Sequence, residues 1–205
     1  VFAPVIAPYD PKEMIASYLP PSREHLLGTN DVGQDIFSEM VYGTRVSLYI
    51  GIFAAFIVTG VGTVLALVSG YFGGVTDKII TAITNIAMAV PSLPLTVLLV
   101  AYLNPGKWSL IIAISVTAWT GTARILRSRV MQLKELPFIK IEKTMGVHPV
   151  VILFKHILPN IKDIILTRGA MAISGAMMTE AGLSFLGLGE FGEKSWGSVL
   201  HYAFF

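Results

Sequence analysis

The chain has 205 residues, of which 54% are apolar and only 14% are charged, far below the roughly 25% of charged residues in a typical soluble domain. The formal net charge of +2 is too small to indicate a nucleic-acid partner. The absence of cysteine excludes disulfides, thiolate metal sites and cysteine nucleophiles. Together these values predict a membrane protein.

The N-terminal segment, residues 1–45, begins with "VFAPVIAPYDP". This stretch has neither the basic start nor the small-residue cleavage site of a signal peptide. It also begins with Val rather than Met. We therefore expect residues 1–45 to form the end of a preceding span, followed by an extracytoplasmic segment.

Two uncharged stretches follow. The first span is "SLYIGIFAAFIVTGVGTVLALVSGYF", residues 47–72, which exceeds the ~20 residues that a helix needs to cross a bilayer core. The second lies in the uncharged stretch 79–106 and carries Pro91 and Pro94 in its middle. Neighbouring helices, hydroxyl groups or water can satisfy the backbone groups freed by a proline. We therefore predict a kinked second span.

Two further spans are expected. The third begins at Trp108, continues through "SLIIAISVTAWTGTA" and ends at the basic stretch "RILRSR". The fourth covers roughly Ile161 to Phe185 and is less apolar, because it contains Arg168 and Glu180. Its small residues in "GAMAISGAM" are typical of helix contacts within lipid.

The distribution of cations predicts the sidedness of these spans. Residues 124–162 hold eight of the fifteen Lys and Arg, and the positive-inside rule places such a connection in the cytoplasm. Alternation then places "GGVTDK" inside, and it places "LNPGKW", the N-terminal segment and the residues after Leu183 outside. Arg124, Arg127 and Arg129 are expected to anchor the end of the third span at the inner interface.

The rest of this basic connection differs from an ordinary polar loop. Pro137, Gly146, Pro149 and Pro159 divide it, and it contains the short amphipathic stretch "FIKIEKTM" and the apolar stretch "VVILF". A surface helix that docks onto a partner combines basic and apolar side chains in this way. Gly146 either permits a tight turn or a close backbone approach, or it is an ordinary helix C-cap.

Three blocks resemble one family. "EKTMGVHPVVILFKHILPN" resembles the cytoplasmic EAA loop of ABC importer permeases. "HLLGTNDVGQDIFSEMVYGTRVSL", and "TEAGLSFLGLG" with "SWGSVL", resemble the permeases of the dipeptide, oligopeptide and nickel importers. The chain differs from the usual pattern at Gln34, where the family has Arg, and at Lys140, Ile141 and Glu142, where the family has Glu-Ala-Ala.

The resemblance implies an all-α, polytopic transmembrane helix bundle of the type I ABC importer permease kind. It implies six spans, so that about four are visible here, with one before residue 1 and one after residue 205. The implied segments are 1–45, described above, a permease domain over 46–189 with a cytoplasmic coupling loop over 132–160, and an extracytoplasmic loop over 190–205 that leads to the last span. The implied location is the inner membrane of a bacterial or archaeal cell.

The resemblance also implies partners: a second homologous permease subunit, cytoplasmic ATP-binding subunits, an extracytoplasmic substrate-binding protein and the lipid bilayer. The coupling loop would be formed by Lys140, Ile141, Glu142, Lys143, Gly146, Ile157, Leu158, Pro159 and Asn160. Glu180 lies in a family block and is expected to close the outer end of the bundle. Arg168 has no match in these blocks and is considered as a residue that lines the pathway or forms a gate.

We expect no catalytic, metal or cofactor-binding residues, since the partner subunits would use the ATP. "GLGEFGEKS" departs from a nucleotide-binding loop, because Glu193 separates Gly192 from Lys194. His25, His148, His156 and His201 are expected to be structural. The expected function is ATP-driven import of di- or oligopeptides. Nickel or metal-chelate import remains an alternative, as does a secondary transporter, which would not need the EAA-like loop.

Overall fold

The computed structural model describes residues 3–104, 106–190 and 192–204. Within these ranges the regular elements are helices, and Thr29 and Asp35 form an isolated antiparallel bridge. The chain divides into two compact units, with unit 1 formed by residues 1–53, 97–114 and 174–205 and unit 2 by residues 54–96 and 115–173. The outermost residues of the predicted segments 1–45 and 190–205, and one residue of "GLGEFGEKS", lie outside the described residues.

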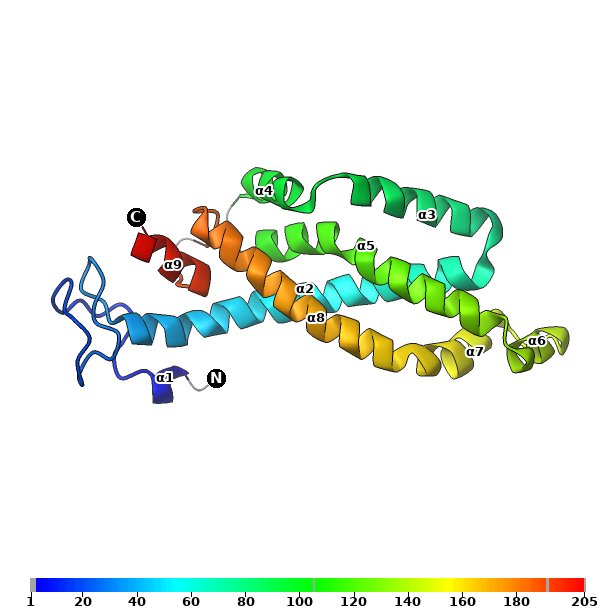
Figure 1. Cartoon of the computed structure of the whole chain (residues 1–205), viewed down its shortest axis with the longest axis horizontal. Helices are drawn as coiled ribbons and strands as arrows, with labels where there is room; N and C mark the ends of the chain where they lie inside the picture. Colours follow the sequence, from blue (N-terminus) through cyan, green and yellow to red (C-terminus); the bar gives the residue numbers. More distant parts are fainter. Residues whose placement is uncertain (1–2, 105, 191, 205) are drawn as a thin grey trace. The chain divides into compact units, whose positions relative to one another are not determined.

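The first and third predicted spans are confirmed as long apolar helices. Helix α2 (Ile36–Phe72) has 37 residues and α5 (Lys107–Lys134) has 28 (Figure 1). Among the described residues, these two are long and apolar enough to cross a membrane on their own. Helix α2 follows Asp35, whose carboxylate accepts a hydrogen bond of 2.8 Å from the backbone N–H of Ser38, as an N-cap residue does.

The predicted kink of the second span is a complete break. Helix α3 (Gly74–Ala89) and helix α4 (Ser92–Leu103) are bent by 87° relative to each other. Val90, between them, is extended, with φ −84° and ψ 128°, because the following Pro91 disfavours a helical conformation in the residue before it. Pro94 lies in the first turn of α4, where a missing N–H is tolerated. Counted together, α3 and α4 form a third candidate span.

The fourth predicted span belongs to a longer continuous helical segment. Helix α7 (Pro149–Ile152), the π-helix η1 (Leu153–Ile157) and helix α8 (Leu158–Phe185) follow one another without a gap. Helix α8 has 28 residues but is not one of the helices that are apolar enough to span alone. Its charged residues, Arg168 and Glu180, oppose insertion into hydrocarbon.

Unit 2 is held together by a core of apolar side chains and by close contact between α2 and α5. A Cβ atom built on Gly62 would lie 2.9 Å from Cβ of Thr122, and one built on Gly70 would lie 2.8 Å from Cβ of Val130. These glycines therefore bring the two backbones closer than any side chain would allow. The buried core residues are Ala66, Leu67, Tyr71, Leu126, Val130, Leu133, Ile139, Ile152, Leu153, Ile157 and Ile161.

In unit 1, helix α9 (Trp196–Phe204) packs closely against α8. A Cβ atom built on Gly197 would lie 2.3 Å from the carbonyl oxygen of Ala181, so only glycine fits at this contact. The indole Nε1 of Trp196 lies 3.2 Å from the carbonyl oxygen of Met40, which connects α9 to α2. The short helix α1 (Ala3–Ile6) begins the described part of this unit.

Candidate functional site

The predicted docking segment contains a short helix, α6 (Pro137–Thr144). Leu136, which precedes it, is extended, with φ −65° and ψ 143°, and Pro137 is the first helical residue, a position where proline is favoured. Ile139 is 1% exposed and belongs to the core of unit 2. Helix α6 is therefore attached to unit 2 through one buried side chain, at the end of α5 that Figure 1 shows beside α7.

Helix α6 ends in a glycine turn. Gly146 has φ +77°, its N–H donates to the carbonyl oxygen of Lys143 at 3.1 Å, and the N–H of Val147 donates to that of Glu142 at 3.1 Å. This pair of hydrogen bonds is a Schellman motif. Within the described chain, no atom lies within 4 Å of the position of a Cβ on Gly146. The C-cap alternative is confirmed, and the open side of Gly146 faces away from the rest of this chain.

Pro159 does not interrupt the helical segment that follows this turn. The imidazole Nδ1 of His148 accepts a hydrogen bond of 3.3 Å from the N–H of Val150, and Pro149 begins α7. Pro159 lacks an N–H and would clash with the carbonyl of Lys155 in a regular α-helix. The π-helix η1, which ends two residues before Pro159, widens the turn at that point. The "ILPN" group is therefore helical.

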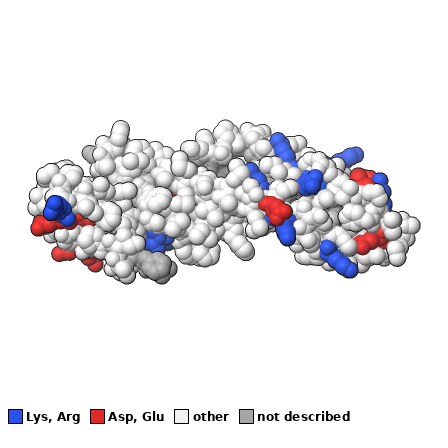
Figure 2. All heavy atoms as spheres, turned by 60° about the horizontal axis from the view of Figure 1, so that its bottom comes forward, with Lys and Arg blue, Asp and Glu red and all other residues white. Residues whose placement is uncertain are grey.

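The outer surface of this segment combines apolar side chains with cations. On α6 and at its C-cap, Phe138 is 44% exposed, Ile141 59% and Met145 75%. The exposed apolar residues of α7 and η1 are Val150, Val151 and Phe154. Figure 2 shows Lys and Arg side chains gathered over this end of unit 2. An exposed apolar patch with a charged rim is typical of a protein–protein contact.

The charged residues of α6 are held by local partners. Nζ of Lys140 lies 2.9 Å from Oε2 of Glu135, and this ammonium holds the pKa of the Glu135 carboxyl below its ordinary value. Nζ of Lys143 lies 4.6 Å from the ring centroid of Tyr71, which is a cation–π distance. These contacts hold both lysine side chains against neighbouring residues of unit 2.

The structure brings Glu142 together with the predicted "ILPN" group. Oε1 of Glu142 lies 2.7 Å from Nε2 of His156 in η1, and the side-chain amide of Asn160 donates to the carbonyl oxygen of His156 at 2.6 Å. Ile157 is buried and Leu158 is partly buried against the core. Among the predicted coupling residues, Ile157 and Leu158 therefore pack against the core of unit 2 and do not form part of the exposed surface.

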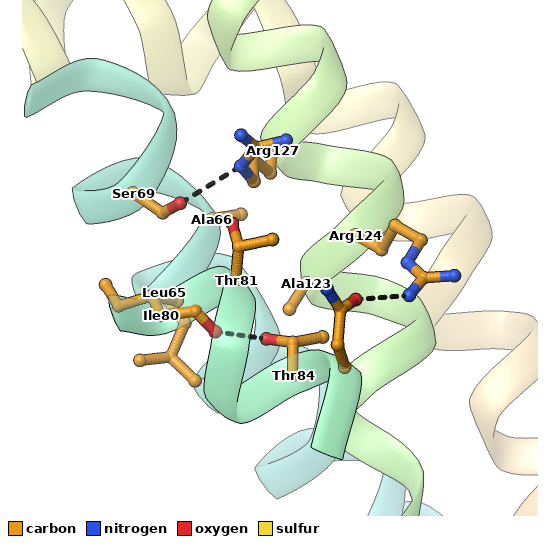
Figure 3. Close-up of a pocket in the computed structure, with 10 residues that line it drawn as sticks. Leu65, Ala66, Ser69, Ile80, Thr81, Thr84, Ala123, Arg124 and Arg127 are labelled. Carbon is orange, nitrogen blue, oxygen red and sulfur yellow. Dashed lines mark hydrogen bonds between the residues drawn. The ribbon is translucent and has the colours of Figure 1, made fainter. Parts of the chain in front are cut away.

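One polar group in unit 2 was not anticipated from the sequence. Nε and Nη2 of Arg127, on α5, bind the two carboxylate oxygens of Asp77, on α3, at 2.6 Å each. The hydroxyl of Ser69, on α2, also donates to Asp77. Arg124 donates to the side-chain oxygen of Asn85 at 2.9 Å. Figure 3 shows these two arginines beside a small cavity between α2, α3 and α5.

This cluster changes the interpretation of the basic stretch at the end of α5. Arg127 was expected to anchor the helix at the membrane interface, and the structure shows in addition that it forms a bidentate pair with a carboxylate, a strong charge-assisted contact. The sequence feature that could have indicated this pair is Asp77, the first charged residue after Arg45. A lone acid at the end of an apolar stretch requires a partner.

Arg168 lies where three helices of unit 2 approach one another. A Cβ on Gly121 of α5 would lie 3.5 Å from Nη2 of Arg168, and one on Gly169 of α8 would lie 3.8 Å from Oγ1 of Thr59 of α2. Nε of Arg168, Oγ1 of Thr59 and Oγ1 of Thr122 are buried without a hydrogen-bond partner in the described part of the chain. Unpaired buried polar groups of this kind are unfavourable.

Glu180 is fully buried in unit 1 and is bound by hydroxyl groups. Ser47 donates to one carboxylate oxygen at 2.9 Å, and Ser184 donates to the other at 2.7 Å. The backbone N–H of Trp196 in turn donates to Ser47 at 3.3 Å. Glu180 thereby connects α2, α8 and the start of α9. Among the described residues, no group of three or more His, Asp or Glu is arranged to hold a metal ion.

Comparisons with known proteins agree on one family. The sequence model of a family described as "Binding-protein-dependent transport system inner membrane component" matches residues 62–204. The oligopeptide transport system permease protein of Bacillus subtilis (strain 168) is 39% identical over 202 residues, covering 97% of this chain and 66% of that protein. The dipeptide transport system permease protein of the same organism is 36% identical, covering 96% and 62%.

A solved structure of the MetNI methionine ABC transporter, in an inward-facing conformation, has a similar fold. The TM-score is 0.64 at 18% sequence identity, and the match covers 82% of this chain and 87% of that one. The chain spans about two thirds of the length of the two permeases from Bacillus subtilis that it matches. The similar fold of the solved structure and the family match confirm the predicted all-α transmembrane bundle.

Proposed function

Because the chain belongs to the family of binding-protein-dependent transport system inner membrane components, we propose that it is the membrane-spanning permease subunit of an ATP-driven importer. It forms half of a substrate pathway and binds no cofactor itself. Its partners are a second homologous permease, cytoplasmic ATP-binding subunits that use the ATP, and an extracytoplasmic substrate-binding protein. The proposed location is the inner membrane of a bacterial or archaeal cell, which the family description and the apolar helices support.

The proposed segments follow from this role. Residues 1–45 are proposed as the end of a preceding span and an extracytoplasmic segment, and residues 46–189 as the transmembrane permease domain. Residues 132–160 within it form the coupling segment, and residues 190–205 form an extracytoplasmic loop that leads to a last span. The density of Lys and Arg in residues 124–162 supports a cytoplasmic position for α6.

The observation that carries the coupling proposal is the arrangement of α6. Ile139 fixes this helix to the core of unit 2, while Ile141 and Met145 stay exposed. An amphipathic helix with such an exposed face fits an apolar groove on a partner. The Schellman turn at Gly146 and the contact between Glu142 and His156 connect α6 to η1 and α8. A displacement of α6 by the ATPase would therefore move α8.

Di- or oligopeptides are the proposed cargo, because the relatives that cover most of this chain are named as oligopeptide and dipeptide permeases. Import of nickel or a metal chelate is the alternative. A secondary transporter is less consistent with α6, because it has no ATPase for this helix to contact. Vanadate-sensitive, ATP-driven uptake of a labelled dipeptide by the reconstituted complex tests the function and the cargo together.

Arg168 is proposed to line the pathway or to form part of a gate. Its buried, unpaired Nε supports a role in which the guanidinium meets water or cargo in another conformation. Arg168→Gln is expected to reduce uptake while the complex still assembles. Uptake and assembly equal to those of the unmodified complex would argue against this role. Lys162→Gln, an exposed cation earlier on α8, is the matched control.

A series of substitutions at Gly146 tests the coupling proposal. Gly146→Asn should retain transport, since Asn tolerates a positive φ. Gly146→Ala introduces backbone strain without bulk, and Gly146→Trp adds a bulky side chain on the open side of the turn. Because no atom of the described chain lies near this position, additional loss in Trp relative to Ala reports contact with a partner. Normal uptake and normal ATPase binding in Gly146→Trp would contradict the proposal.

A further inference from the structure

Unit 1 contains a large open cavity. Its volume is about 1140 Å³, which exceeds the roughly 300–1,000 Å³ of most small-molecule sites. Its wall is formed by the N-terminal segment, the first turns of α2, the start of α5, and residues within 184–190 and 192–202. The cavity has room for a peptide of several residues, more than a metal ion or a single amino acid requires.

Charged side chains of both signs line this cavity. They are Asp10, Lys12, Asp31, Arg45, Lys107, Glu190, Glu193 and Lys194. Nζ of Lys107 lies 2.5 Å from Glu193 and 3.5 Å from Glu190, and Lys194 lies 2.8 Å from the buried Glu39. These four lining residues are therefore engaged in ion pairs within the chain.

The other four charges are available to a ligand. Within the described ranges, Asp10, Lys12, Asp31 and Arg45 form no ion pair. Two cations and two anions thus share one cavity without neutralising each other. A ligand that carries separated positive and negative groups would satisfy both signs.

Arg45 has the features of a carboxylate-binding residue. Tyr42 and Tyr49 are three residues before it and four after it on α2, so the three share one helix face, and all three line the cavity. The ring of Tyr49 contacts Phe53 and Trp108, with centroids 4.5 and 6.3 Å apart, which holds it in place. A guanidinium can bind a carboxylate through two parallel hydrogen bonds.

We propose that this cavity binds a free peptide in its zwitterionic form. Arg45 receives the terminal carboxylate, Asp31 receives the terminal ammonium, and Tyr42 and Tyr49 contact the chain between them. The choice of a peptide rests on the proposed function, whereas the requirement for two opposite charges comes from the cavity itself. A divalent cation fits poorly, because the described residues hold no convergent set of ligands here.

Direct binding to the complete transporter, without its substrate-binding protein, tests this inference. Radiolabelled trialanine is titrated onto the complex in lipid nanodiscs, with trialanine amide and N-acetyl-trialanine as competitors. Arg45→Gln should weaken trialanine binding about tenfold or more, the loss expected for a hydrogen-bonded charge, and Arg45→Lys should restore part of it. Trialanine amide should bind the unmodified complex and Arg45→Gln equally.

The second half of the proposal has its own test. Asp31→Asn should weaken trialanine binding but leave the binding of N-acetyl-trialanine unchanged. Arg23→Gln, an exposed arginine of the same segment outside the cavity, should bind as the unmodified complex does. Melting temperatures of all variants identify any loss of fold.

Three results would each overturn the inference. They are no trialanine binding by the unmodified complex, equal affinity in Arg45→Gln, and equal affinity for trialanine and its amide. The proposed function fails separately, if the complete system with its substrate-binding protein shows no ATP-driven peptide uptake. Binding to the cavity can therefore fail while peptide transport persists, and the reverse outcome is equally distinguishable.

Discussion

Arg127 and Asp77, fifty residues apart in the sequence, form a bidentate ion pair with two N–O distances of 2.6 Å. The pair connects α5 to the first turn of α3, and Ser69 of α2 donates to the same carboxylate. Three helices of unit 2 therefore meet at one partly buried carboxylate. The two charged side chains are 28% and 17% exposed, so water screens their attraction only in part.

Removing one partner of this pair should destabilise unit 2. In Arg127→Gln the carboxylate of Asp77 remains partly buried without a cation, which should cost about 2–4 kcal/mol. Thermal unfolding of the detergent-solubilised complex should show a lower melting temperature. Arg129→Gln is the control, because the Arg129 side chain forms no ion pair in the described chain and hydrogen-bonds Gln132 there. Equal melting temperatures for the two variants would refute the importance of the pair.

A cluster of hydroxyl groups holds Glu180, and its substitution should affect α9. Glu180→Gln keeps one acceptor and lets a rotated hydroxyl accept from the new amide, so a small effect is expected. Glu180→Leu removes the acceptor to which the hydroxyls of Ser47 and Ser184 donate, at about 2 kcal/mol. Tryptophan fluorescence and thermal unfolding measure the change near Trp196. Asp163→Asn, an exposed acid of α8, should change neither signal.

Gly197 should not tolerate any side chain. A Cβ atom there would lie 2.3 Å from the carbonyl oxygen of Ala181 and 2.7 Å from its Cα, and both are backbone atoms that move only with α8. Gly197→Ala should therefore displace α9 and cost about 1–3 kcal/mol. Gly182→Ala is the matched control, since no atom lies within 4 Å of a Cβ there. An unchanged fluorescence spectrum and melting temperature in Gly197→Ala would contradict the packing.

Cysteine labelling can test the sidedness directly, because the chain has no cysteine of its own. Met145→Cys, at a residue that is 75% exposed, and Tyr18→Cys, at one that is 77% exposed, give two reporters. An impermeant maleimide added to intact cells should label Tyr18→Cys only, and both should react after denaturation in sodium dodecyl sulfate, which also removes any partner bound to α6. Labelling of Met145→Cys in intact cells would reverse the orientation and remove the contact of α6 with a cytoplasmic ATPase.

Structural features that depend on local sequence composition were predicted well. An uncharged stretch of more than twenty residues leads to α2, because hydrocarbon requires this composition and length. The shorter uncharged stretch between Lys107 and Arg124 leads to α5. The position of Pro137 and Gly146 also predicted the limits of α6, since each residue acts on its own backbone. The resemblance in three blocks predicted the family that the comparisons support.

Effects that depend on surroundings were not predictable from the same residues. Pro91 was expected to kink a helix, and it separates two helices bent by 87°. Pro159 was expected to divide the basic segment, yet the π-helix before it keeps the helix continuous. The partner of Asp77 was also hidden, because the sequence does not specify which of several cations on α5 will face it. These outcomes depend on how neighbouring helices pack.

The π-helix between α7 and α8 has a consequence for helical phase. A π-turn accommodates one extra residue relative to an α-helix, so η1 absorbs that residue locally and the side chains that follow keep their rotational position. Deleting a single residue from Leu153–Ile157 would restore regular α-helical turns there and leave α8 unrotated. The ring of Pro159 would then meet the carbonyl four residues before it, because the widened turn that accommodates it would be gone.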